Sequence, residues 1–155
     1  MGKEIERKWI LTKFPDQISE GNHWEVEQLY VSLYPEVRFR KKFDYSTGQT
    51  DYKLTAKSRG SLVRSEFETK IDELIWSEGL AAAGEPIVKD FYKFNYEGHT
   101  YEVSQVDDAF IYVELEFESV EEANAFDTLY QQANRIKCGT IGINALSELI
   151  KKYEE

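Results

Sequence analysis

The sequence is poor in the residues that build disulfides and soft-metal sites. Only one of its 155 residues is cysteine and two are histidine. Cys138 therefore has no partner for a disulfide within the chain, and it offers no cysteine-based zinc site. His23 and His99 are too scattered for a histidine-rich metal site. No Gly-x-x-x-x-Gly-Lys-Ser/Thr loop occurs either, which argues against P-loop chemistry.

Long apolar runs are also missing. No stretch approaches the roughly 20 apolar residues of a membrane helix. The first eight residues lack the apolar run of a signal peptide. We therefore expect a cytoplasmic protein without a membrane partner.

Positive charge is in short supply overall. The chain has 29 acidic and 19 basic residues, for a formal net charge of −10. This balance disfavours nonspecific binding to nucleic acid or to an anionic membrane surface, although it does not exclude a local basic pocket. It leaves the oligomeric state open, a homodimer included.

The apolar content is that of a folded domain. Hydrophobic residues make up 41% and aromatic residues 14% of the chain, which argues against disorder. We see no internal repeat and no low-complexity linker. Residues 1–155 are therefore expected to form a single domain with a buried core.

Alternating apolar and polar residues predict a sheet-dominated α+β fold with about eight mostly antiparallel strands. The expected strands are Lys3–Leu11, Trp24–Tyr34, Val37–Tyr45, Thr50–Ser58, Leu62–Ile71, Ile87–Tyr96, Thr100–Val106 and Ile111–Glu118. Helical spacing predicts a short helix over Asp72–Leu80, a helix capped by Ser119, and a final helix capped by Asn144.

Charged residues gather on one parity of several predicted strands. Arg38 and Arg40, for example, alternate with Val37 and Phe39, so that the cations share one face of the strand. For a single strand, this pattern is explained by the solvent-exposed face of a β-sandwich. A membrane barrel is a second alternative, because its strands also have polar residues facing inward and apolar residues facing outward. Residues of both charge signs recur on one face of several strands, and the chain also has amphipathic helices. These features favour a soluble, closed, eight-stranded antiparallel β-barrel with a charged tunnel.

Such a tunnel predicts metal and phosphate chemistry. Clustered carboxylates suit Mg²⁺ or Mn²⁺, which prefer oxygen ligands. Arginine and lysine suit the oxygens of a triphosphate. Phosphoryl transfer depends mainly on positioning and charge neutralisation, with a carboxylate to orient or deprotonate water.

A series of motifs resembles the CYTH superfamily, the triphosphate tunnel metalloenzymes. The motifs run in order from residue 4 to about 118: Glu4-Ile5-Glu6-Arg7-Lys8, Arg38-Phe39-Arg40, Leu54-Thr55-Ala56-Lys57, Arg64-Ser65-Glu66-Phe67-Glu68, Lys89 and Glu114-Leu115-Glu116-Phe117. The resemblance implies an eight-stranded tunnel that hydrolyses inorganic or organic triphosphates at the terminal phosphoanhydride with Mg²⁺ or Mn²⁺.

The resemblance also implies roles for individual residues. Metal ligands would be Glu4, Glu6, Glu114 and Glu116. Phosphate-binding residues would be Lys8, Arg38, Arg40, Lys57, Arg64 and Lys89. Lys8, Glu66 and Glu68 would be catalytic, with the two glutamates binding a second metal or orienting the attacking water.

Two positions depart from the family pattern. Phe91 stands where many bacterial members have an arginine, and Ser104 stands where an acid is frequent. These changes motivate a noncatalytic phosphoanion-binding protein as an alternative. An adenylate cyclase is a further alternative, since cyclases occur among the relatives, although nothing here specifies an adenine pocket.

Overall fold

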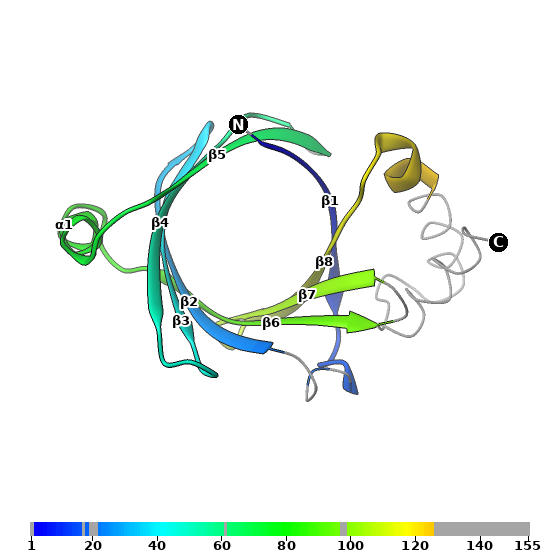
Figure 1. The fold of residues 1–155 in the computed structure, drawn as a ribbon, viewed down its shortest axis with the longest axis horizontal. Coiled ribbons are helices and arrows are strands. Elements are labelled where there is room, and N and C mark those ends of the chain that lie inside the picture. The colour runs from blue at the N-terminus through cyan, green and yellow to red at the C-terminus, as the bar shows by residue number, and fades with distance from the viewer. Residues whose placement is uncertain (1, 17, 19–21, 61, 97–98, 126–155) are drawn as a thin grey trace. The chain divides into compact units, whose positions relative to one another are not determined.

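The structure is a computed structural model that describes residues 2–16, 18, 22–60, 62–96 and 99–125. Eight strands form a closed antiparallel β-barrel with the hydrogen-bonding order β1-β5-β4-β3-β2-β6-β7-β8 (Figure 1). The strands are β1 (Gly2–Leu11), β2 (Asn22–Leu33), β3 (Glu36–Asp44), β4 (Thr50–Lys57), β5 (Val63–Lys70), β6 (Ile87–Tyr96), β7 (His99–Val106) and β8 (Phe110–Glu116), with helix α1 (Glu73–Ala83) between β5 and β6.

The predicted fold class is confirmed, and all eight predicted strands occur. Strand ends differ from the predicted ones by two residues or fewer, which is within the fraying expected at element ends. Ser46-Thr47-Gly48 lie in the turn that joins β3 to β4. The Asp44 carboxylate accepts hydrogen bonds from the Ser46 N–H at 2.8 Å and the Ser46 hydroxyl at 2.6 Å, and Gly48 adopts a positive φ of 70°.

Contacts divide the chain into two compact units. Unit 1 comprises Met1–Glu4 and His23–Phe91, and unit 2 comprises Ile5–Asn22 and Tyr92–Glu155. Strands β1 and β6 each contribute residues to both units. The expectation of a single domain stays a prediction.

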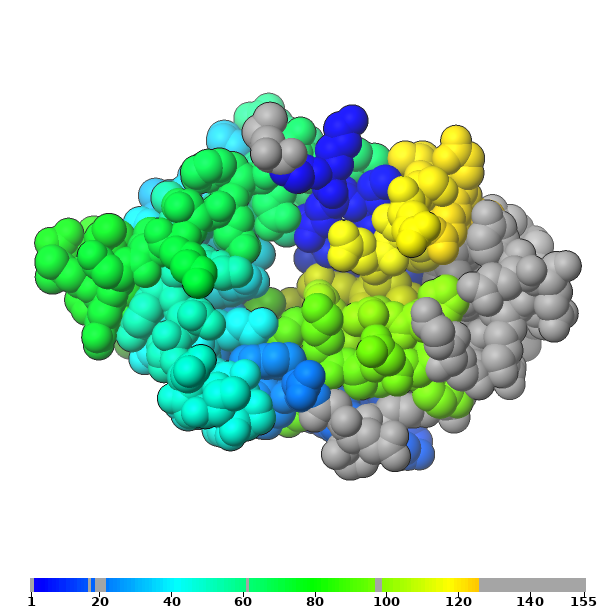
Figure 2. Space-filling model, viewed as in Figure 1, coloured from blue at the N-terminus to red at the C-terminus, as the bar shows by residue number. Residues whose placement is uncertain are grey.

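Helix α1 covers part of the apolar face of the strands in unit 1. The helix lies beside β3 and β4 in Figure 1, and the side chains of α1 pack directly on the strands of unit 1 in Figure 2. Trp76 is buried and approaches the Tyr52 ring at 6.1 Å. Gly79 is also buried, and a Cβ atom there would stand 2.6 Å from the Phe39 ring. The absence of a side chain at Gly79 thus allows α1 to approach β3 closely.

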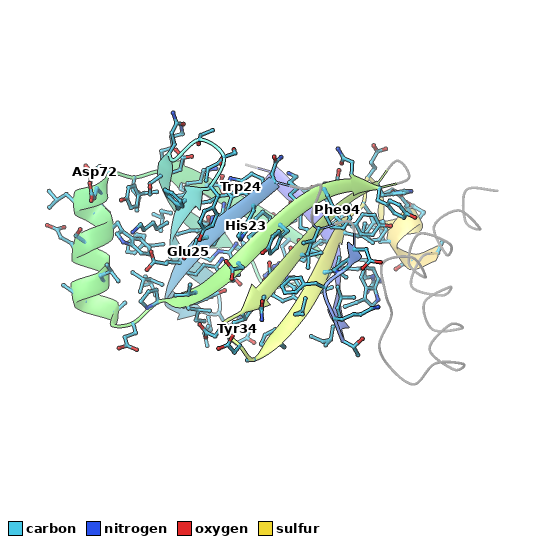
Figure 3. The ribbon with its side chains drawn as sticks, turned by 90° about the horizontal axis from the view of Figure 1, so that it is seen from below. His23, Trp24, Glu25, Tyr34, Asp72 and Phe94 are labelled. Atoms are coloured by element: carbon cyan, nitrogen blue, oxygen red, sulfur yellow. The ribbon has the colours of Figure 1, made fainter. Side chains whose placement is uncertain are left out.

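Helix α1 has strong signals at both ends. Asp72 is its N-cap, and the side chain accepts a hydrogen bond from the Ile75 N–H at 2.8 Å (Figure 3). The helix ends at Gly84, whose φ is 92° and whose N–H donates to the Leu80 carbonyl. The helix runs three residues beyond the predicted end at Leu80, because residues 81–83 are alanines, the strongest helix formers.

Unit 2 has an apolar core on one face of its strands. Tyr101, Val103 and Val113 are fully buried, and Trp9 is 5% exposed. The Phe94 ring stacks on Tyr101 at a centroid distance of 5.5 Å. These residues alternate with charged ones on β1, β7 and β8, so the opposite face of the same strands is free for polar side chains.

The predicted N-cap at Ser119 is confirmed. The Ser119 hydroxyl accepts a hydrogen bond from the Glu122 N–H at 3.1 Å, and the Glu122 carboxylate accepts one from the Glu118 N–H at 3.0 Å. The remainder of that helix, the predicted helix after Asn144, and Cys138 lie outside the described residues. Within the described ranges, no helix is both long enough and apolar enough to cross a membrane.

Candidate functional site: a cation network and a carboxylate cluster

Strand register aligns charged side chains across three strands of unit 1. Each row takes one residue from β3, one from β4 and one from β5. The rows are Glu36–Lys57–Glu66, Arg38–Thr55–Glu68 and Arg40–Lys53–Lys70. Residues two apart on a strand point to the same side, so these rows form one face, which we call the charged face of unit 1.

Lys57 is the buried cation of the first row. Its side chain is 5% exposed, and its Nζ lies 2.7 Å from a Glu4 carboxylate oxygen and 4.0 Å from a Glu66 oxygen. Burial of an ammonium group is costly unless it is paired in this way. Glu4 and Glu66 thus compensate the cost of burying the Lys57 side chain.

Glu36 joins two arginines at the same end of the charged face. Its carboxylate lies 3.5 Å from the Arg38 guanidinium and 3.7 Å from that of Arg64. Both arginine side chains are mostly buried, with exposures of 13% and 18%. A cavity of 590 Å³ adjoins Glu36 and Arg64, and Tyr34 at the β2–β3 hairpin also lines it (Figure 3).

Glu68 gathers three donors. Its carboxylate accepts hydrogen bonds from Lys53 at 2.7 Å and from the Thr55 hydroxyl at 3.4 Å, and it lies 3.5 Å from the Arg40 guanidinium. Burial alone would raise the pKa of Glu68, but the hydrogen bond and charge of Lys53, with the charge of Arg40, hold that pKa below its ordinary value. Glu68 is therefore ionised at neutral pH.

Lys89 and Phe91 lie on β6. Lys89 is 9% exposed and thus buried. The Phe91 ring contacts Trp24 at 5.6 Å, and the Lys42 ammonium lies 4.4 Å from the Trp24 ring and 5.0 Å from the Phe91 ring. Where the family resemblance leads us to expect an arginine, Phe91 thus joins an aromatic cluster that contacts the Lys42 ammonium group.

Unit 2 presents a cluster of carboxylates around Lys8. The Lys8 Nζ lies 3.4 Å from Glu6 and 3.5 Å from Glu114, and the two carboxylate side chains are only 10% and 15% exposed. Glu116 is paired with Glu6 in the β1–β8 register. Burial alone would lower the pKa of the Lys8 amine, but the charges of Glu114 and Glu6 outweigh it and raise that pKa. Lys8 is therefore a fixed positive charge.

These carboxylates have the chemistry that a divalent cation requires. Carboxylate oxygens are the ligands that Mg²⁺ and Mn²⁺ prefer; Glu6 and Glu114 lie near Lys8, and Glu116 is paired with Glu6 in the strand register. Glu4, the fourth predicted ligand, instead contacts Lys57 in unit 1. In the part of the chain that the structure describes, no three His, Cys, Asp or Glu side chains are grouped closely enough to hold a metal. The four-glutamate metal site stays a prediction.

Most of the predicted site residues fall into two sets. Unit 1 brings together Glu4, Arg38, Arg40, Lys57, Arg64, Glu66 and Glu68, and unit 2 brings together Glu6, Lys8 and Glu114. The structure adds Glu36, Lys53 and Thr55, which the sequence reasoning did not select. Their parity on β3 and β4 matches that of Arg38 and Lys57, and this signal could have identified them.

The comparisons with known proteins agree with this geometry. No protein-family model matches the chain. An inorganic triphosphatase from Nitrosomonas europaea is 32% identical over 138 residues, covering 79% of this chain and 82% of the relative. A closed eight-stranded barrel with an ion-paired charged face and this degree of identity define the class. The chain belongs to the CYTH superfamily, the triphosphate tunnel metalloenzymes.

Solved structures show the same fold. The PH1819 protein of Pyrococcus horikoshii OT3 superposes with a TM-score of 0.57 at 20% identity, covering 96% of this chain and 99% of the other. The PH1012 protein of the same organism gives a TM-score of 0.57 at 19% identity, covering 85% of this chain and 88% of the other. At these identities the likeness extends to the fold and no further.

Proposed function

We propose that this protein hydrolyses a triphosphate at its terminal phosphoanhydride bond in a reaction that requires a divalent metal. The observation that carries the proposal is the ion-pair network of unit 1. There, five cations (Arg38, Arg40, Lys53, Lys57 and Arg64) share four carboxylates (Glu4, Glu36, Glu66 and Glu68). The identity to an inorganic triphosphatase supports it and favours inorganic tripolyphosphate as the first substrate to test.

The cation network suits a chain of phosphates. Guanidinium groups bind phosphate oxygens in pairs, and ammonium groups add point charge. Because Arg38, Arg40 and Arg64 are held by carboxylates before substrate arrives, little reorganisation is needed to bind it. Arg38, Arg40, Lys57, Arg64 and Lys89 are the proposed substrate-binding residues of unit 1.

The metal belongs to the carboxylates of unit 2 in this proposal. Glu6, Glu114 and Glu116 would hold Mg²⁺ or Mn²⁺, with Glu4 as the further ligand that the family pattern implies. When bound there, a divalent ion would supply positive charge to the phosphate oxygens. Lys8, with its raised pKa, contributes charge to the transition state rather than a proton.

Water attack needs a carboxylate acceptor. Glu68 keeps its negative charge at neutral pH, because its pKa lies below the ordinary value, so it accepts a hydrogen bond from water and does not act as an acid. Glu66 is the second candidate for this task. In the reaction the water oxygen bonds to the terminal phosphorus and the bridging P–O bond breaks, which gives orthophosphate and, from tripolyphosphate, pyrophosphate.

The cluster of Trp24, Lys42 and Phe91 favours one alternative, a phosphoanion-binding protein without turnover. Phe91 brings no charge to the site and engages the Lys42 ammonium. Calorimetric binding of tripolyphosphate without release of orthophosphate would support this alternative.

We also infer that the substrate is a small molecule and that the protein is cytoplasmic, as the sequence predicts.

Two neighbouring residues on β3 provide a matched test. Arg40 lies on the charged face next to Glu68, whereas Lys41 points to the other side and contacts Glu27 at 3.3 Å. Release of orthophosphate from tripolyphosphate with Mg²⁺ or Mn²⁺ should fall at least 100-fold in Arg40→Ala and stay within twofold in Lys41→Ala. Absence of release by the wild-type protein at high concentration with either metal would reject the proposal.

A further inference from the structure

A buried amide on β2 lies beside the arginines of unit 1. Gln28 is 3% exposed and is paired with Arg40 in the β2–β3 register. Directly paired residues on antiparallel strands have Cβ atoms about 5 Å apart on the same face. The Gln28 amide therefore belongs to the charged face of unit 1, although neither the sequence reasoning nor the resemblance selected it.

The two ends of this amide differ in their hydrogen bonding. The Oε1 atom accepts a hydrogen bond from the Tyr30 hydroxyl at 3.3 Å, which fixes the orientation of the amide group. The Nε2 atom is buried and has no hydrogen-bond partner among the described residues. A buried donor without a partner costs free energy, and native proteins retain few of them.

The surroundings of Nε2 indicate what would satisfy it. Tyr30 is paired with Arg38 and Gln28 with Arg40, so Gln28 shares its face of the sheet with two arginines, whose guanidinium groups are donors only. Glu36 and Glu68 face these guanidinium groups, but no described group accepts a hydrogen bond from Nε2, so this donor calls for a further acceptor. An anionic oxygen is the strongest such acceptor.

We propose that the Gln28 Nε2 amide donates a hydrogen bond to a phosphate oxygen of the bound triphosphate, and that Tyr30 holds the amide in the donating orientation. This inference rests on the proposed function and adds a neutral donor to the cationic set. In the absence of substrate, the unsatisfied donor lowers the stability of the protein, and substrate binding removes that cost. Gln28 is thus a substrate-binding residue, and Tyr30 is a positioning residue.

The test separates binding from stability. Gln28→Met keeps the length of the side chain and removes the amide, whereas Gln28→Glu keeps the acceptor for Tyr30 and removes the donor. Gln49→Met is the matched control, because it makes the same chemical change in an exposed turn of unit 1. Calorimetry with tripolyphosphate in the absence of divalent metal gives Kd, and thermal unfolding without ligand gives the melting temperature.

We expect Gln28→Met to weaken tripolyphosphate binding about tenfold or more, the usual effect of losing a hydrogen bond to a charged group. Its melting temperature without ligand should equal or exceed that of the wild type. Gln28→Glu should weaken binding further, and Tyr30→Phe should weaken it several-fold. Gln49→Met should leave Kd unchanged.

Unchanged Kd values for both Gln28 variants would overturn the inference and leave the proposed function intact. A fall in melting temperature with unchanged Kd in Gln28→Met would assign Gln28 a structural role and overturn the inference equally. If Gln28→Met does not fold, Gln28→Glu decides by the same criterion. A wild-type protein that neither binds nor hydrolyses tripolyphosphate would reject the proposed function, and the role of Gln28 with it.

Discussion

At the scale of single residues, Lys57 shows how the charged face stabilises itself. Its buried ammonium group contacts Glu4 at 2.7 Å and Glu66 at 4.0 Å, and the three side chains come from three different strands. Two carboxylates around one ammonium group would repel each other without it. The ion pairs therefore depend on one another, and their energies should not add.

This dependence can be measured. Lys57→Met should lower the free energy of unfolding by about 2–3 kcal/mol, because it leaves partly buried carboxylates without their cation. Glu4→Gln in the same background should restore about 1 kcal/mol, since it removes one of the two facing charges. Urea unfolding of the wild type, both single variants and the double variant measures the coupling. Strictly additive effects would contradict it.

At the same scale, Glu68 is expected to make the stability of the protein depend on pH. The pKa of Glu68 is lower in the folded protein than in the unfolded chain. In an unfolded chain the pKa of a glutamate is about 4.3. Its contribution to stability is therefore complete above that pH and is lost as pH falls toward the lower, folded value. We expect the stability difference between wild type and Glu68→Gln to shrink as pH is lowered from 6 to below 4. Parallel stability curves over that range would show that Glu68 is not involved.

At the scale of secondary-structure elements, the fit of α1 against β3 depends on a missing side chain. Gly79 lowers the helix propensity of α1 by about 1 kcal/mol relative to alanine. Packing reverses the preference, because a Cβ atom at this buried position would stand 2.6 Å from the Phe39 ring. Phe39 belongs to the face of β3 opposite Arg38 and Arg40, so α1 supports the strand that carries the arginines.

Gly79→Ala should therefore destabilise the protein by about 1 kcal/mol, as overpacking costs of 1–3 kcal/mol exceed the gain in helix propensity. Glu78→Ala, one residue earlier on the exposed side of α1, should change stability by less than about 0.5 kcal/mol. Chemical denaturation compares the two variants. A more stable Gly79→Ala would indicate that α1 does not pack closely on β3.

The strands also show which features of the site the sequence predicts and which it does not. Period-2 alternation predicts strands, and parity predicts which side chains share a face, so Arg38, Arg40 and Lys57 could be grouped in advance. Parity does not give the register between strands, which determines that Glu68 contacts Lys53 and Arg40. Register also brings Gln28 beside Arg40, and an isolated glutamine in a strand has no charge to draw attention to it.

At the scale of the whole molecule, the net charge of −10 conceals a division between the units. The charged face of unit 1 has five ion-paired cations for four carboxylates, whereas the cluster of unit 2 has one ammonium group, that of Lys8, for Glu6, Glu114 and Glu116. This difference is the basis for our proposal that unit 1 binds the anionic substrate and unit 2 the metal ion. The net charge of the whole chain describes neither unit.

The division predicts different defects from one substitution in each unit. Arg40→Ala should weaken binding of tripolyphosphate at least tenfold even without metal, because it removes a phosphate-binding guanidinium. Glu114→Gln should bind metal-free tripolyphosphate as tightly as the wild type or more tightly, because it removes a negative charge. It should nevertheless lose most Mg²⁺-dependent release of orthophosphate, because it removes a proposed metal ligand. Calorimetry with and without Mg²⁺, together with phosphate release, distinguishes the two defects, and equal loss of metal-free binding in both variants would contradict the division.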